Sequence, residues 1–301
     1  MRGYLLAILA VFTFCAWASP MRYGELQQEL KEYVESKDAT IGVAVVIDGV
    51  DRVEVNGDRE FPMLSVYKFP IALALAEHYR QNKLPFDFPI AILPEDLHTD
   101  TYSPMTEKIL SSSRVQTDTL MMPTGELLSY MLQLSDNNAS DIVLQGLGGA
   151  QYVEDYLGRI GVVDVHVCNS EAEMHRAPSL CYANSATPEG MASLMDIFGR
   201  EFNDSLSIEI KHLMSTCETG AGRLPKPLAC TDAVVCHKTG TGFTLPDGRL
   251  MAVNDAGYVS LPDGRAYSIA VFIENSGYDM AQTEAIIAEI SGMVYGAVSS
   301  R

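Results

Sequence analysis

The sequence predicts an α/β fold: an antiparallel sheet flanked by the terminal helices, an α/β sandwich, into which an all-helical subdomain is inserted. Three observations predict it: strand-like segments near both ends of the chain, a long helical stretch between them, and an amphipathic helix at each terminus. The sheet would use residues 19–58 and 218–301, and the helical subdomain residues 59–217. We expect the functional site to lie between the two parts.

The first elements follow from hydrophobic periodicity. In residues 24–36 (GELQQELKEYVES) the apolar side chains recur at helical spacing, which predicts an amphipathic helix. Residues 41–48 (IGVAVVID) are a nearly continuous apolar run that predicts a buried strand. Asp48 and Gly49 form a turn pair that leads into a second strand at 51–55. These segments supply the N-terminal part of the sheet.

The middle of the chain is predicted to be helical. Helical patterns occur at 65–79, 125–133, 139–146, 151–161 and 188–198. Thr124, Ser135 and Thr187 are candidate N-caps, and Pro188 suits the first position of a helix.

The strand signal returns after Thr231. Strands are predicted at 233–238, 250–260 and 266–274, with a turn at 262–264. Residues 279–298 then close the chain as an amphipathic helix.

Composition limits the classes of partner. With 301 residues, of which 47% are hydrophobic, the chain can bury a sizeable core. Its formal net charge of −18 and isoelectric point near 4.6 argue against a nucleic-acid partner, because few cations are available to neutralise a phosphate backbone. We attribute the acidity to solubility.

The N-terminus has the features of a secretory signal. Arg2 precedes an apolar run at 4–14, and Ala16 and Ala18 form an A-x-A cleavage site before Ser19. The run is too short to span a bilayer. We therefore expect residues 1–18 to be removed and the protein to be exported, periplasmic or secreted, without a membrane anchor.

Cleavage would leave five cysteines, so at most two disulfides could form. Cys168 could pair with Cys181, and Cys217 with Cys230 or Cys236, and the spacing does not choose among these pairings. No C-x-x-C pair occurs and the six histidines are scattered, which disfavours a metal site. We predict no metal.

Three short motifs carry the chemistry: S-x-x-K at 65–68, S-D-N at 135–137 and K-T-G at 238–240, each present once. A serine hydroxyl is a weak nucleophile at neutral pH and needs a neighbouring base. If Ser65 opens a helix, Lys68 lies one turn on and on the same face, within reach of the hydroxyl. The motifs predict an activated serine with substrate-docking partners.

These motifs, in this order, resemble those of class A serine β-lactamases and penicillin-binding proteins. Further strings at 102–108 (YSPMTEK), 238–242 (KTGTG) and 254–257 (NDAG) extend the resemblance to class A β-lactamases over about residues 23–297. The resemblance implies a monomeric hydrolase that opens a small-molecule β-lactam without an organic cofactor and so confers β-lactam resistance.

The resemblance also implies roles for individual residues. Ser65 would be acylated, with Lys68 as its proton partner, and Ser135 would pass a proton to the lactam nitrogen. The backbone N–H groups of Ser65 and Thr241 would form the oxyanion hole. Substrate contacts would come from Tyr102, Asn137, Arg223, Lys238, Thr239, Gly240 and Thr241. Two of these residues have an alternative, non-catalytic interpretation. Ser135 could instead be the N-cap of a helix, and Arg223 could be a solvated charge in a loop.

Glu171 decides between the two families. Penicillin-binding proteins lack a well-placed base to hydrolyse their acyl-enzyme, whereas class A enzymes carry a glutamate on a loop after the S-D-N motif. Glu171 suits that place, although Ala172 follows it instead of proline, and His175 replaces the asparagine that helps to hold the water. Glu173 is a competing base. His175 either holds the water or is structural.

The same loop predicts the substrate class. A divergent, cephalosporin-preferring branch of class A has similar sequences after its glutamate, and Gly242 and Phe243 leave room for bulky side chains. Two alternatives stay open: a penicillin-binding transpeptidase or carboxypeptidase, and a sensor that is acylated once without turnover. In both alternatives the acyl-enzyme would not be hydrolysed efficiently, whereas in a β-lactamase Glu171 would assist this hydrolysis.

Overall fold

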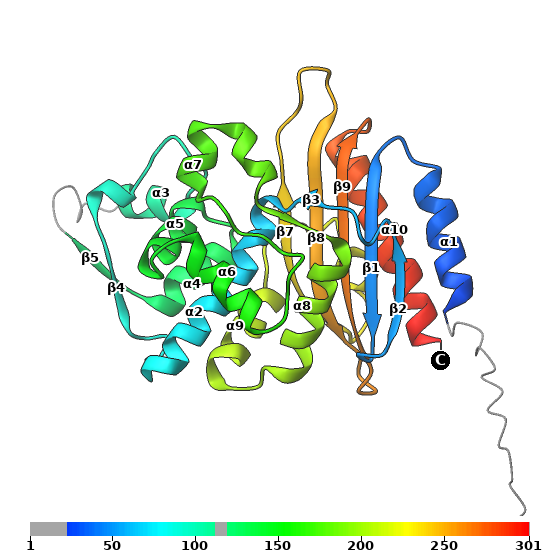
Figure 1. Ribbon diagram of the computed structural model, residues 1–301, viewed down its shortest axis with the longest axis horizontal. Coiled ribbons are helices and arrows are strands. Elements are labelled where there is room, and N and C mark those ends of the chain that lie inside the picture. The colour runs from blue at the N-terminus through cyan, green and yellow to red at the C-terminus, as the bar shows by residue number, and fades with distance from the viewer. Residues whose placement is uncertain (1–22, 112–118, 301) are drawn as a thin grey trace, which may run out of the picture.

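Five strands form the central sheet, and helices cover both of its faces (Figure 1). The computed structural model describes residues 23–111 and 119–300. Neighbouring strands are antiparallel, in the order β2-β1-β9-β8-β7. They are β1 (Thr40–Ile47), β2 (Asp51–Val55), β7 (Val234–Thr241), β8 (Leu250–Ser260) and β9 (Ala266–Ser276). The predicted fold class is confirmed.

The apolar run of β1 is buried throughout because its side chains alternate between two cores. Val43 and Val45 share one core with α1 (Gly24–Glu35) and α10 (Met280–Ser299). Ala44 belongs to the other core, which the helical insertion builds. A strand covered on both faces needs no polar side chains, which explains the continuous IGVAVVI sequence.

The helical part stands on the left in Figure 1, opposite α1 and α10. Its helices are α2 (Lys68–Asn82), α3 (Pro104–Ser111), α4 (Thr124–Gln133), α5 (Asn137–Gly146), α6 (Ala150–Arg159), α7 (Glu171–Arg176), α8 (Pro188–Glu201) and α9 (Ser205–Ser215). α8 packs against β1 and β9, and α9 packs against β7. These contacts fix the helical part against the sheet.

Shorter elements connect these layers. Two strand pairs join β3 (Phe61–Pro62) to β6 (Ser185–Ala186) and β4 (Pro89–Ile92) to β5 (Leu120–Pro123). The 3₁₀ turns are η1 (Leu64–Tyr67), η2 (Pro94–Asp96), η3 (Pro178–Tyr182) and η4 (Lys226–Leu228). The helix expected at 65–79 is therefore split, because η1 holds Ser65 and α2 starts only at Lys68.

Two of the three predicted N-caps are wrong. Thr187 caps α8 as predicted. Thr124 is instead the first residue of α4, and its hydroxyl donates to the Phe88 carbonyl. Asp136, not Ser135, caps α5, because an ionised carboxylate satisfies the N–H groups at a helix start.

Three helices were not expected from periodicity: α3, α7 and α9. α7 has six residues, fewer than two turns. In α9, Leu206, Ile208 and Ile210 alternate with polar residues, a spacing that indicates a strand rather than a helix. Asp204 caps α9 by accepting from two backbone N–H groups, and this cap starts the helix.

Cys168, Cys181, Cys217, Cys230 and Cys236 are all free, so neither of the disulfide patterns considered above forms. Their surroundings differ: Cys236 is buried with its thiol near the Lys211 carbonyl, at 3.4 Å, whereas Cys168 is exposed. The signal peptide predicted at 1–18 lies outside the described residues. Among the helices of 23–111 and 119–300, none has both the length and the apolar character needed to cross a bilayer.

Candidate active site

A cavity of about 490 Å³ lies where the helical part meets the end of β7. Its wall includes Ser65 from η1, Asn137 from α5, Glu171 from α7 and Thr241 from β7. A larger hollow of about 810 Å³ lies elsewhere, beside Arg80, and contains none of the motif residues. Residues of the S-x-x-K and S-D-N motifs and the predicted base therefore line the smaller cavity, together with Thr241, which directly follows the K-T-G motif.

Lys68 joins these elements. It is fully buried at the start of α2. Its Nζ donates to Asn137 Oδ1 at 2.6 Å and to the Ser135 carbonyl at 2.8 Å, and it lies 3.1 Å from Glu171 Oε1. A single ammonium thus contacts the S-D-N motif and the predicted base, one turn from Ser65.

Ser135 has a strained backbone, with φ +61°, a value that non-glycine residues rarely adopt. Its Oγ accepts from Lys238 Nζ at 2.9 Å. The next residue, Asp136, is buried and caps α5, and it also accepts from the Ser103 hydroxyl and the Met105 N–H. Asp136 therefore braces the turn that aims Ser135 at Lys238.

Gly240 lets β7 approach η1 closely. A Cβ at this position would lie 2.3 Å from the Met63 carbonyl oxygen, a separation that real Cβ atoms essentially never show, and 3.3 Å from the Ser65 nitrogen, which is also tight. Leu64, just before the serine, has φ +49°. The glycine and this turn place the backbone of Ser65 beside the end of β7, where Thr241 lies.

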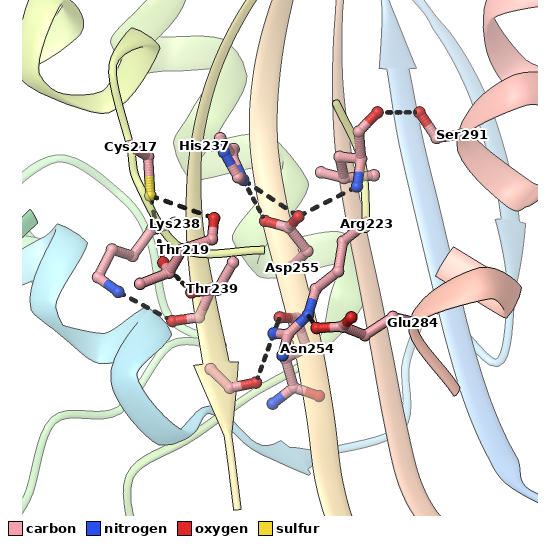
Figure 2. Close-up of polar contacts among 12 residues, drawn as sticks. Cys217, Thr219, Arg223, His237, Lys238, Thr239, Asn254, Asp255, Glu284 and Ser291 are labelled. Atoms are coloured by element: carbon pink, nitrogen blue, oxygen red, sulfur yellow. Dashed lines mark hydrogen bonds and ion pairs between the residues drawn. The ribbon is translucent and has the colours of Figure 1, made fainter. Parts of the chain in front are cut away.

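Two cations lie along β7. Lys238 is fully buried, and burial, helped by the charges of Lys68 and Arg223, lowers its pKa to about 7. Arg223 is buried too, so its alternative as a solvated loop charge is wrong. Its guanidinium donates to Glu284 Oε1 at 3.0 Å (Figure 2). It also donates to Thr241 Oγ1 at 2.7 Å. Arg223 therefore reaches the cavity wall through Thr241.

Five of the seven predicted substrate contacts are not among the residues that line the cavity: Tyr102, Arg223, Lys238, Thr239 and Gly240. Thr239 is buried, and its hydroxyl is 2.6 Å from that of Thr219. Tyr102 is 57% exposed, and its carbonyl accepts from the Asn137 N–H. The tyrosine thus stands at the surface next to the S-D-N motif.

Glu171 is the first residue of α7, with a side chain only 15% exposed. Asp141, which sequence analysis did not identify, holds its backbone: the two carboxylate oxygens accept from the N–H groups of Glu171 at 2.7 Å and Ala172 at 2.8 Å. Burial raises the pKa of Asp141 to about 6. Asp141 lies one helical turn after Asn137, on the same face of α5. This spacing is the feature of the sequence from which Asp141 could have been predicted.

Glu173 and His175 lie differently on the same helix. Glu173 is exposed, and its carboxylate completes a capping box with Ser170. His175 lines the cavity, half exposed, with Nε2 3.3 Å from Asp100. Of the two candidate bases, only Glu171 contacts Lys68, so the geometry favours Glu171.

The site combines a serine hydroxyl, a buried ammonium-carboxylate pair, and cations along a strand edge. This set suits attack on a carbonyl followed by hydrolysis of the resulting ester. Within 23–111 and 119–300, no group of three or more His, Cys, Asp or Glu side chains is arranged to hold a metal ion.

Comparison with known proteins gives consistent matches. The model of the "Beta-lactamase enzyme family" matches residues 25–298. A β-lactamase of Bacteroides uniformis is 35% identical over 99% of this chain and 100% of its own, and the extended-spectrum β-lactamase PER-1 of Pseudomonas aeruginosa is 29% identical over 95% and 92%. The crystal structure of a class A β-lactamase from Bacteroides cellulosilyticus DSM 14838 superposes with a TM-score of 0.87 at 32% identity, covering 94% of this chain and 100% of that one.

Proposed function

Because the chain belongs to the class A serine β-lactamases, hydrolases that open the β-lactam amide bond and confer resistance, we propose that Ser65 carries the acyl-enzyme and that Glu171 assists its hydrolysis. The observation that carries this assignment is the position of Lys68 Nζ, in contact with Glu171, Asn137 and the Ser135 carbonyl. The substrate partner is a small-molecule β-lactam. A monomeric state stays a prediction.

In the acylation step, Ser65 Oγ forms a bond to the lactam carbonyl carbon, and the C–N bond of the ring breaks. The Lys68–Glu171 pair takes the serine proton, and it replaces the proton that Ser135, held by Lys238, delivers to the ring nitrogen. The backbone N–H groups of Ser65 and Thr241 stabilise the oxyanion in the tetrahedral intermediate.

Substrate binding relies on the other motif residues. Lys238 and the hydroxyl of Thr241, which Arg223 holds, attract the carboxylate that bicyclic β-lactams carry. Asn137 has its Oδ1 committed to Lys68, and its amide nitrogen, now 2.8 Å from Thr101 Oγ1, is the group available to the substrate side chain. Thr239, Gly240 and Tyr102 complete the strand edge and the mouth of the site.

In the deacylation step, Glu171 takes a proton from water, the water oxygen bonds to the ester carbon, and Ser65 regains its proton as the ester breaks. His175 lines the same cavity, and we assign to it the holding of this water. Asp141 supports the step indirectly because it fixes the start of α7.

We extend the proposal to cephalosporins and to export. Gly242 and Phe243 both line the cavity beside β7, and PER-1, an extended-spectrum relative, aligns over most of the chain. Export rests on the signal predicted at 1–18.

The proposal is tested by mixing the chain from Ser19 onward with a chromogenic cephalosporin in a stopped-flow instrument, at enzyme concentrations that resolve the first turnover. We expect continuing hydrolysis after the first turnover, and the same with a penicillin. A single stoichiometric burst would identify the sensor or penicillin-binding alternative. Penicillin hydrolysis without cephalosporin turnover would refute only the substrate preference.

Gly240→Ala is expected to lower kcat by roughly 10²- to 10³-fold, the usual cost of losing an oxyanion-hole donor. The added methyl cannot remain 2.3 Å from the Met63 carbonyl, so β7 must move away from η1. Steady-state kinetics and thermal melting measure the effect. Gly158→Ala, at a helical position with open space, is the matched control. Unchanged kcat in Gly240→Ala would argue against the proposed oxyanion hole.

The KM for a carboxylate-bearing β-lactam is expected to rise roughly tenfold between pH 6.5 and 8.5. The pKa of Lys238 is lowered to about 7 by burial, so the side chain is charged below that pH and loses its proton above it. The Lys238→Arg variant keeps its charge and should show a flatter profile. A wild-type KM that does not change with pH would contradict the assignment of Lys238.

A further inference from the structure

A contact between two side chains lies beside the active-site cavity and takes part in none of the steps described above. His175 on α7 places Nε2 3.3 Å from a carboxylate oxygen of Asp100, a residue of the segment before α3. α3, α5 and α7 lie close together at the upper left of Figure 1, and α5 packs against both of the others. The contact therefore links the helix that carries Glu171 to the segment that precedes Tyr102.

His175 and Glu171 each line two cavities. Both belong to the wall of the cavity that contains Ser65, and both also line a smaller cavity of about 170 Å³. Asp100 lines the smaller cavity and is not part of the wall around Ser65. Asp100 therefore does not face the substrate, and any effect on the reaction passes through the residue that it contacts, His175.

Both partners of this contact are fastened to α5. Next to Asp100, Thr101 accepts a hydrogen bond at Oγ1 from the Asn137 side chain, at 2.8 Å. At the other partner, Asp141 holds the first turn of the helix that carries His175, through the N–H groups of the first two residues of α7. One helix thus sets the separation of the two side chains.

The contact decides which ring nitrogen of His175 serves the cavity. A neutral imidazole has one nitrogen that donates and one that accepts. A carboxylate only accepts, so the proton of the ring belongs on Nε2, next to Asp100. Nδ1 is then the acceptor, and it is the atom suited to take a hydrogen bond from the water that attacks the acyl-enzyme.

The value of the pair lies in orientation rather than in stability. The side chains of His175 and Asp100 are 51% and 69% exposed, and exposed ion pairs contribute little to folding. A ring that is half in solvent has little packing to fix its rotation, so one carboxylate on Nε2 makes a large difference to its direction.

We propose that Asp100 is a positioning residue for deacylation: it holds Nε2 of His175, so that the ring presents Nδ1 to the water that Glu171 activates. This inference rests on the water-holding role assigned to His175 in the proposed function. It gives a role to a residue that belongs to none of the three motifs and that does not touch the substrate.

The first test is a double-mutant cycle on the deacylation rate. With enzyme in excess over a cephalosporin, rapid quenching and intact-protein mass spectrometry follow the acyl-enzyme and give the acylation and deacylation rate constants separately. Asp100→Ala should slow deacylation roughly three- to fivefold, the size typical of an exposed pair, and leave acylation unchanged. In a His175→Asn background, where the asparagine amide can hold the water, the same change should have no effect.

Two further variants separate orientation from charge. Asp100→Asn is neutral but keeps an oxygen that accepts from Nε2, so it should recover most of the wild-type deacylation rate. Glu95→Ala removes one negative charge from an exposed residue of η2 that lines neither cavity. This control should acylate and deacylate like the wild type.

The second test needs no β-lactam. ¹³C relaxation of labelled histidine rings measures how rigidly each ring is held, and the signal that is lost in His175→Asn identifies His175. In Asp100→Ala, the order parameter of the His175 ring should fall clearly. The buried His237 ring, whose Nδ1 is 2.9 Å from Asp255, is the internal reference and should keep its value.

The outcomes separate the inference from the proposed function. An unchanged deacylation rate in Asp100→Ala, or the same slowing in the His175→Asn background, would overturn the inference. An unchanged order parameter of His175 in Asp100→Ala would overturn it too. Absence of an acyl-enzyme in the wild type would instead refute the proposed function, and the relaxation experiment would still decide whether Asp100 holds the ring.

Discussion

Ser65→Ala is expected to lower β-lactam hydrolysis by about 10⁴- to 10⁶-fold, the range typical for loss of a catalytic nucleophile. The hydroxyl is the only group of Ser65 that the change removes, and its backbone N–H stays in place beside β7. Lys68, Asn137 and Lys238 keep their hydrogen bonds to one another and to Ser135. Substrate should therefore still bind to the variant, with no covalent adduct.

Steady-state hydrolysis and intact-protein mass spectrometry after exposure to a penicillin measure this prediction. Ser129→Ala is the matched control, because the Ser129 hydroxyl donates to the Glu126 carbonyl of its own helix and lies outside the lining of the cavity. We expect the control to turn over normally and to show any adduct that the wild type shows. Substantial hydrolysis by Ser65→Ala, or an adduct on another residue, would rule out Ser65 as the nucleophile.

The long elements could be predicted because hydrophobic burial restricts them. The strand predicted at 250–260 coincides with β8, and both terminal helices match within one residue at each end. These segments bury one or both faces along their whole length, so the apolar pattern is uninterrupted. α7 and α9 could not be predicted in this way, since they depend on caps and on contacts with distant parts of the chain.

The motif strings of the site could be predicted, but not how they meet. The sequence predicts that Arg223 lies in a loop and faces substrate or solvent, but it is buried because Glu284 on the last helix and the Asn254 carbonyl on β8 accept its hydrogen bonds. The sequence allows Ser135 to be a helix cap, but its backbone has a positive φ and its hydroxyl accepts a hydrogen bond from Lys238. Both outcomes depend on residues far away in sequence, which no local pattern contains.

The choice between Glu171 and Glu173 shows what helical geometry adds. Side chains of residues i and i+2 on a helix point in directions that differ by about 200°. The carboxylates of Glu171 and Glu173 therefore cannot face the same cavity. Glu171 contacts Lys68, and Glu173 turns back to cap the helix at Ser170. The sequence places both acids in the right segment, and only the fold shows which of them reaches the buried lysine.

Glu171→Gln is therefore expected to stop the reaction after acylation. Glutamine keeps the size of the side chain and an oxygen that accepts from Lys68, but it cannot take a proton from water. In stopped-flow experiments with a chromogenic cephalosporin, the variant should give one burst equal to the enzyme concentration. Turnover should then be at least about 10²-fold slower than in the wild type. Mass spectrometry should find the trapped adduct on the peptide that contains Ser65.

Glu173→Gln is the matched control, two residues along the same helix. Because Glu173 only caps α7, this variant should turn over steadily, with at most a small loss of thermal stability. The reverse result, steady turnover in Glu171→Gln and a single burst in Glu173→Gln, would make Glu173 the base and would require α7 to rotate when substrate binds. Loss of the burst itself in Glu171→Gln would show that the carboxylate also takes the proton from Ser65, because then acylation as well as hydrolysis depends on its contact with Lys68.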